Sequence, residues 1–290
     1  MYSDRELRRL DHTSVMLHDL TAVERFADTM GFVVSPPMGV TEAAIENRIV
    51  TLQTEAIDLM MIQKRGVLPG DLDGVLDTRE GLFGLIFRVD EDEKVRAAEK
   101  ALKRFGFQAV VVEGQRPEVQ PDGSVLRARW IMCGSLHPTS PLFRIFVCCH
   151  YDHDIFFRPA LKTHSNGATR TSRILAAAKC IEEYEPMIRF LFGDEYVCTH
   201  DAGLQAKMAD DVELLVFTPD ALRERYEDHV SFEGHDQIYI VGQEIRVASL
   251  DTVLRMFDAN GVPHVQLRDR RILVPPAFFG NVAWTFSASD

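Results

Sequence analysis

Residues 12–34, HTSVMLHDLTAVERFADTMGFVV, contain the pattern that decides the fold. An apolar strand-like segment, 12–17, precedes an amphipathic segment whose apolar residues recur at helical spacing, and a second apolar segment follows Gly31. Asp19 suits the start of the helix, where its side-chain oxygen can accept a free backbone N–H. Gly31 suits the end, because glycine adopts the left-handed conformation without steric cost. The stretch therefore predicts a strand, a helix and a second strand.

The same helix–glycine–strand pattern occurs three more times along the chain. These copies begin at Asp90, Cys180 and Ser249, and their glycines are Gly106, Gly193 and Gly261. Unequal intervals between the copies indicate diverged units with loop insertions rather than a solenoid.

Three strand-like segments follow the first helix, so each copy is interpreted as a βαβββ unit. In the first unit these segments are FVVSPP (32–37), NRIVTLQ (47–53) and AIDLMMIQ (56–63). One such unit leaves a face of its sheet uncovered, and two units can close their sheets around a shared cavity. The prediction is an α+β fold with four βαβββ units, paired into two open, curved sheets with helices on the outside.

The pairing predicts two domains joined by a linker. The N-terminal domain is expected at 8–150, the linker at 151–169 and the C-terminal domain at 170–290. Polar and turn residues dominate the linker, but Ile155, Phe156 and Phe157 lie within it. We therefore expect it to pack on a domain face.

Composition excludes several classes of protein. A formal net charge of -12 argues against nucleic acid as a partner, because such a field repels polyphosphate. Five cysteines without a CxxC pair predict neither a disulfide framework nor a zinc knuckle. No apolar run is long enough for a membrane span, and the opening residues lack the apolar core of a signal peptide. A cytoplasmic protein without a membrane partner is expected.

Four segments, in this order, carry a family resemblance. They are LDHTSVMLHDLTAVERFADTMGF (10–32), AIDLMMIQ (56–63), FRIFVCCHYDHDIFFRP (143–159) and THSNGA (163–168). Together they resemble the glyoxalase-like branch of the vicinal oxygen chelate superfamily, which also includes bleomycin-resistance proteins and extradiol dioxygenases. The resemblance implies a small-molecule substrate or ligand and no nucleotide cofactor. A homodimer is compatible with it.

The resemblance also implies one divalent metal (Zn, Ni, Mn or Fe) inside the first curved sheet. Its candidate ligands are His12 in the first strand, Asp58 in the last strand of the first unit and His150 at the close of the second. A charged Asp58 within an apolar strand is costly unless it is paired or metal-bound. Each of the three is alternatively a buried polar group with a structural partner. Glu213 has a setting like that of Asp58 but is interpreted as a vestige or an exposed strand residue.

Three further residues are candidates for substrate binding. Arg144, in the middle of an apolar segment, could hold a carboxylate in a bidentate pair. It is alternatively a surface charge. His164 and Asn166 belong to the HSNGA segment, where their alternative role is to stabilise a turn. The sequence assigns no catalytic residue.

Two functions follow from the resemblance. The first is an enzyme, a lyase, isomerase or dioxygenase that acts on a small oxygenated metabolite through the metal. The second is a metal-free protein of the bleomycin-resistance type that sequesters a small molecule between aromatic walls. Phe83, Trp130, Phe143 and Trp284 are candidate wall residues. The fold alone does not decide between the two.

Overall fold

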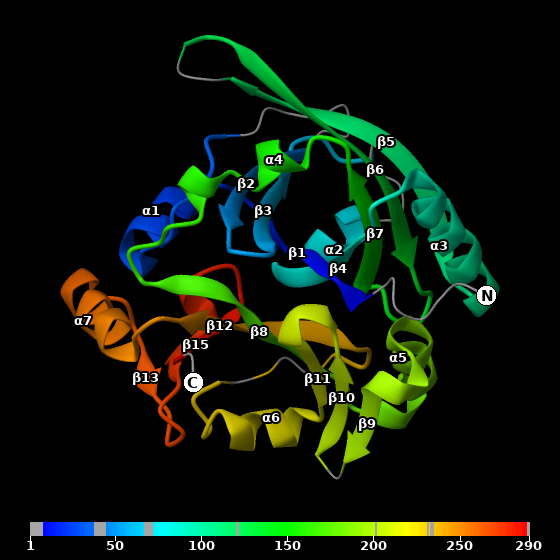
Figure 1. Cartoon of the computed structure of the whole chain (residues 1–290). Helices are drawn as coiled ribbons and strands as arrows, with labels where there is room; N and C mark the ends of the chain where they lie inside the picture. Colours follow the sequence, from blue (N-terminus) through cyan, green and yellow to red (C-terminus); the bar gives the residue numbers. More distant parts are fainter. Residues whose placement is uncertain are drawn as a thin grey trace.

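The computed structural model describes residues 8–37, 45–66, 72–119, 122–200, 202–230, 232 and 235–288. Two curved sheets make up most of it, one from each half of the chain (Figure 1). This confirms the predicted α+β fold of βαβββ units paired into two sheets. None of the described helices is long and apolar enough to cross a membrane.

The first sheet has seven strands in the order β2-β3-β1-β4-β7-β6-β5. Its strands are β1 (Leu10–Leu17), β2 (Ile45–Thr51), β3 (Ala56–Ile62), β4 (Gly81–Arg88), β5 (Gln108–Val119), β6 (Val125–Leu136) and β7 (Arg144–His150). Its helices are α1 (Thr21–Met30), α2 (Leu72–Thr78) and α3 (Asp92–Phe105), and α4 (His153–Phe156) follows the last strand. β1 pairs parallel with β3 and antiparallel with β4, which in turn pairs parallel with β7.

The second sheet has eight strands in the order β13-β14-β15-β12-β8-β11-β10-β9. Its strands are β8 (Ala168–Ala177), β9 (Val197–His200), β10 (Gly203–Lys207), β11 (Glu213–Phe217), β12 (Tyr239–Val247), β13 (Val265–Gln266), β14 (Ile272–Val274) and β15 (Ala283–Ala288). Its helices are α5 (Glu185–Phe192), α6 (Pro219–Arg225) and α7 (Leu250–Asn260). The pairing of β8 with β11 and β12, and of β12 with β15, repeats that of the first sheet.

One predicted strand is wrong. FVVSPP (32–37) runs as a loop, so the first sheet has one strand fewer than the second. Its Ser35 does meet β2, since its N–H donates to the carbonyl of Ile49 at 2.8 Å and its Oγ accepts from the N–H of Ile49 at 3.0 Å. Pro36 and Pro37 then end the contact, because proline has no N–H to donate to a ladder.

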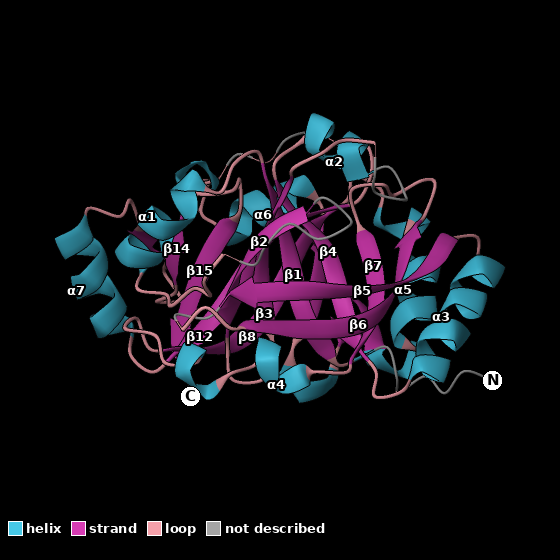
Figure 2. Ribbon diagram, turned by 90° about the horizontal axis from the view of Figure 1, so that it is seen from above, coloured by secondary structure: helices cyan, strands magenta, loops and turns pink. Residues whose placement is uncertain are grey.

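The two halves share a core where their helices meet. α1 lies beside α7 at one end of the molecule, and α3 lies beside α5 at the other (Figure 2). Phe26 of α1 stacks on Phe279 with 3.9 Å between ring centroids, and the ring centroid of Trp284 lies 5.5 Å from that of Phe26. Between the sheets, Thr13 donates to Gln243 at 2.8 Å, which places a hydrogen bond inside the buried contact.

The HSNGA segment also connects the halves. His164 Nδ1 accepts from the backbone N–H of Val33 at 3.0 Å, and its Nε2 donates to the carbonyl of Thr51 at 2.9 Å. Asn166 donates to the carbonyl of Met30 at 2.8 Å and accepts from the N–H of Ala168 at 2.9 Å. Both side chains are buried, so they satisfy backbone groups that water does not reach.

This arrangement predicts a pH-dependent stability. Burial lowers the pKa of His164 below its usual range, although the hydrogen bond to the Thr51 carbonyl raises it in part. The unfolded chain therefore binds this proton more readily, and stability is expected to fall by up to about 1.4 kcal/mol per pH unit below about pH 6.5. His164→Gln keeps an acceptor and a donor but cannot titrate. Urea unfolding of both proteins from about pH 5 to 8 measures the difference, and equal pH slopes would contradict the prediction.

Candidate metal centre

A bulge in β1 brings two successive side chains to the same place. In the pairing with β4, Leu10 is opposite Phe87 and His12 is opposite Ile86, which leaves Asp11 without a pairing partner. Successive residues of a regular strand point to opposite faces. The extra residue of a bulge breaks that alternation and redirects a side chain. Here Asp11 and His12 meet, and His12 Nδ1 lies 2.7 Å from Asp11 Oδ2.

His150, the last residue of β7, completes the group. Its Nε2 lies 2.9 Å from the same Asp11 Oδ2. Candidate ligand atoms from Asp11, His12 and His150 all lie within 4.8 Å of one another, the one such group among the residues described. β4 pairs with both β1 and β7, so the three residues come from strands on either side of it.

The convergence of these atoms suits a cation. Asp11 is fully buried, and its Oδ1 has no hydrogen-bond partner. His12 Nδ1 and His150 Nε2, which face Asp11, would bind a metal once they release the protons that they share with Asp11. Two imidazoles and one carboxylate form a set that binds divalent transition metals. These residues therefore fit the metal that the fold family implies.

The protonation of Asp11 is consistent with this role. Burial by itself would raise the pKa of Asp11, but the charge of His150 and the hydrogen bonds from His12 and His150 outweigh it and hold that pKa far below its usual range. Cys148 lies nearby, with its Sγ 3.6 Å from His150 Nε2. Burial, followed by the charge of Asp11, raises the pKa of Cys148 well above its usual range, so the thiol stays protonated.

Asp58 lies in the same pocket but outside the group of three. Asn47 Nδ2 donates to its Oδ1 at 2.6 Å, and Arg116 Nη1 lies 3.8 Å from its Oδ2. The structure thus brings together two of the three ligands predicted from sequence, His12 and His150, with Asp11 in addition. Apolar side chains from β2, β3 and the segment after β7 complete the wall. The pocket residues are Asp11, His12, Ile49, Ala56, Asp58, Arg116, His150, Phe156 and Phe157.

Two phenylalanines of the linker close this pocket. The ring centroid of Phe156 lies 4.3 Å from that of His150, and that of Phe157 lies 6.4 Å from it. The space that remains is about 10 Å³, which is room for one water molecule or ion. A substrate therefore needs the segment around α4 to move.

Phe156→Ala is expected to open the centre. Loss of the ring uncovers His150, so a chelator should remove a bound metal several-fold faster from the variant than from the wild type. Stopped-flow mixing with a chromogenic chelator measures this rate. Val110→Ala on β5 is the control, because Val110 is exposed and lies outside the pocket. Equal release rates in Phe156→Ala and the wild type would show that the ring does not limit access.

The predicted substrate-binding residues lie elsewhere. Arg144 is buried at the start of β7, and its Nε donates to the carbonyl of Pro141 at 2.8 Å. His164 and Asn166 bind backbone groups of the first half as described above, and Asn166 also accepts from the N–H of Ala168 in its own turn. None of the three lines the pocket.

The second sheet repeats the bulge with an arginine in the place of His12. β8 and β12 shift register between Thr171 and Arg173, so Arg173 follows this bulge as His12 follows the bulge in β1. The guanidinium of Arg173 is held by Glu213 at 3.0 Å and by Glu244 at 3.1 Å. An arginine does not coordinate a cation, so the candidate centre lies in the first half.

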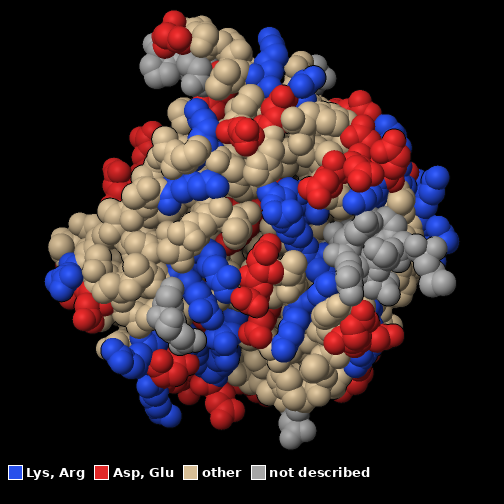
Figure 3. Space-filling view, in the orientation of Figure 1, with Lys and Arg blue, Asp and Glu red and all other residues tan. Residues whose placement is uncertain are grey.

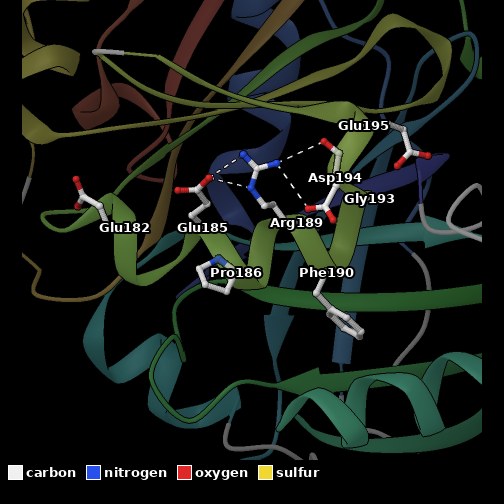
Figure 4. A pocket seen from close by; sticks show the side chains of 8 residues that line it. All are labelled: Glu182, Glu185, Pro186, Arg189, Phe190, Gly193, Asp194 and Glu195. Atoms are coloured by element: carbon white, nitrogen blue, oxygen red, sulfur yellow. Dashed lines mark hydrogen bonds and ion pairs between the residues drawn. The ribbon is translucent and has the colours of Figure 1, made fainter.

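A larger hollow lies on the surface at α5 (Figure 4). Its volume is about 600 Å³, and its lining residues are Glu182, Glu185, Pro186, Arg189, Phe190, Gly193, Asp194 and Glu195. Arg189 is already paired with Glu185 at 2.7 Å and with Asp194 at 3.6 Å. Its cationic group is therefore satisfied within the protein, and the acidic surroundings offer nothing that selects a ligand.

Comparison with known proteins agrees with this architecture. The family described as "Glyoxalase-like domain" matches residues 10–189. No curated protein sequence matches the chain. A hypothetical protein from Staphylococcus aureus has a similar structure, with a TM-score of 0.66, 10% identity, and coverage of 97% of this chain and 99% of that one.

Two similar structures are enzymes by name. A mutant of 4-hydroxymandelate synthase from Streptomyces coelicolor has a TM-score of 0.60 and 10% identity, over 97% of this chain and 92% of that one. A variant of homoprotocatechuate 2,3-dioxygenase from B. fuscum has a TM-score of 0.59 and 12% identity, over 98% and 72%. Such low identities show a common fold only. The family match over most of the chain shows that this protein belongs to the glyoxalase-like domain family.

Proposed function

We propose that this protein is a metal-dependent enzyme, of the oxygenase type, that acts on a small oxygenated metabolite. The observation that carries the proposal is the group of Asp11, His12 and His150 on the inner side of the first sheet. Two histidines and one carboxylate with open positions are the ligand set of non-haem Fe(II) oxygenases. Two structures with the same fold carry the names of a dioxygenase and of 4-hydroxymandelate synthase, which supports this choice.

Asp11 would hold the metal together with His12 Nδ1 and His150 Nε2, the ring nitrogens that face it. When bound, the metal would supply Lewis-acid activation of adjacent substrate oxygens. Before a metal binds, Asp11 Oδ2 accepts from both imidazoles, so it holds the two rings in place around the centre.

The rest of the pocket controls access. Phe156 and Phe157 limit the access of water to the centre, which strengthens electrostatic interactions inside it. Because the remaining space holds only one water molecule or ion, substrate binding and displacement of this segment must be coupled.

A metal-free binding protein is the second candidate. Asp11 Oδ2 already accepts hydrogen bonds from both histidines, so the group is partly satisfied without a cation. Apolar walls from Ile49, Phe156 and Phe157 suit a sequestered ligand.

Metal content decides between the two. Protein stripped with a chelator is loaded anaerobically with Fe(II), Mn(II), Ni(II) or Zn(II), desalted and measured by elemental analysis. We expect about one equivalent of at least one metal, and oxygen uptake by the Fe(II) form with a panel of vicinal diols and 2-oxo acids. If no metal is retained, the enzyme proposal fails. A ligand-induced rise in melting temperature without metal would then support the binding protein.

A further inference from the structure

Among the described residues, Arg116 is the one Lys or Arg side chain that lines the pocket, and it is incompletely satisfied. It comes from β5, in the long hairpin with β6 that extends past the other strands in Figure 1. Its side chain is 13% exposed, and its buried Nε has no hydrogen-bond partner. Six other described arginines also have a buried Nε without a partner, but none of them lines this pocket, where the free donor of Arg116 can meet an acceptor from a ligand.

Asp58 positions Arg116 without saturating it. The two side chains are 3.8 Å apart, too far for a hydrogen bond, whereas Asn47 donates to the other oxygen of Asp58 at 2.6 Å. The carboxylate is thus anchored from β2, and it holds the guanidinium at the pocket by charge. The planar guanidinium of Arg116 therefore has N–H donors left for the carboxylate of a ligand.

Phe156 marks the space in which the body of a ligand would lie. Its ring centroid is 4.3 Å from that of His150 and 6.0 Å from the guanidinium carbon of Arg116. One apolar group is therefore close to both the candidate metal centre and the arginine. Ile49 and Ala56 extend this apolar surface.

Charge in the pocket favours an anion. A bound divalent metal and Arg116 would together carry three positive charges against the two carboxylates of Asp11 and Asp58. On the face drawn in Figure 3, Lys and Arg side chains are interspersed with Asp and Glu, so the charges that decide binding are those of the pocket itself.

We propose that the substrate is a small organic acid with an apolar, aromatic-sized body, and that Arg116 binds its acid group. The body would take the space that Phe156 now fills, close to His150. This inference rests on the proposed function for the identity of the site, but it concerns binding by Arg116 and not the metal.

A matched pair of probes tests the inference. The acid 3-phenylpropanoate and its amide, 3-phenylpropanamide, have nearly the same shape and differ by one charge. Binding of each is measured by calorimetry and by ligand-observed NMR, with metal-free and metal-loaded protein. We expect the wild type to prefer the acid by about tenfold or more, because a charge-assisted hydrogen bond replaces a neutral one.

Variants assign that preference to one side chain. Arg116→Gln should bind both probes alike, and Arg116→Lys should retain part of the preference, because lysine keeps the charge but not the fork. Arg96→Gln is the matched control, since Arg96 is half exposed on α3 and pairs with Glu113 outside the pocket. It should behave as the wild type. Thermal melting of each variant verifies that it is folded.

Several results would overturn the inference. They are equal binding of acid and amide by the wild type, an undiminished preference in folded Arg116→Gln, and no binding of either probe. If the acid preference depends on Arg116 and no metal is retained, the inference stands while the proposed enzyme fails. If metal binds but Arg116 has no effect, the enzyme stands and the substrate class is wrong.

Discussion

Asp11→Asn is expected to lower metal affinity by about 10–100-fold, whereas Asp58→Asn should leave it within a few-fold. Asparagine keeps the size of the side chain but loses the charge that balances a cation and holds both imidazoles. Asp58 faces Asn47 and Arg116 and does not belong to the group with His12 and His150. Competition with a fluorescent chelator measures the two affinities, and elemental analysis gives the stoichiometry.

This pair of variants also separates two carboxylates that share a pocket. Both substitutions remove one negative charge from the same cavity, so a general electrostatic effect would lower the metal affinity of both variants alike. A large loss in Asp58→Asn with little change in Asp11→Asn would make Asp58 the ligand. A large loss in both would mean that the metal needs the two carboxylates together.

Phe26→Ala is expected to reduce the free energy of unfolding by about 3–5 kcal/mol. Phe26 belongs to α1 but stacks on Phe279 and approaches Trp284, which belong to the other half of the chain. Its loss leaves a cavity in a contact that both halves share, so both should be destabilised together. Urea unfolding followed by fluorescence and circular dichroism measures this change.

A substitution outside the shared core serves as the control. Val110→Ala removes a side chain that is 40% exposed, so it should change stability by less than about 0.5 kcal/mol. Two separate unfolding transitions in Phe26→Ala, with one at the position of the wild type, would show that the halves unfold independently. A single transition at lower urea concentration is expected.

Most of the architecture could be predicted from local pattern. Each amphipathic segment with its glycine became a helix in the structure, and Gly31, Gly106 and Gly261 take the left-handed conformation expected at a helix end. The exception was FVVSPP, in which apolar residues favoured a strand but two prolines removed the donors that a ladder needs. Helices and turns depend on neighbours in sequence, so the sequence contains enough to find them.

The metal centre was only partly predictable. His12 and His150 were candidates because they interrupt apolar strands at the places that the family resemblance indicated. Asp11 was missed, since strict strand alternation puts it on the face opposite to His12. Nothing in the residues Leu10, Asp11 and His12 predicts a bulge. A carboxylate next to a candidate ligand could nevertheless have suggested that both belong to one site.

The sequence by itself determined the repeated units and their order, because these depend on periodicity, and its family resemblance indicated the two histidines that could meet a metal. Tertiary structure alone decided which carboxylate joins them. The register between β1 and β4 creates the bulge that turns Asp11 inward, and the fold brings Asn47 and Arg116 to Asp58. The register between β1 and β4 depends on how both strands pack, and the two are far apart in the sequence. No local pattern can therefore predict it.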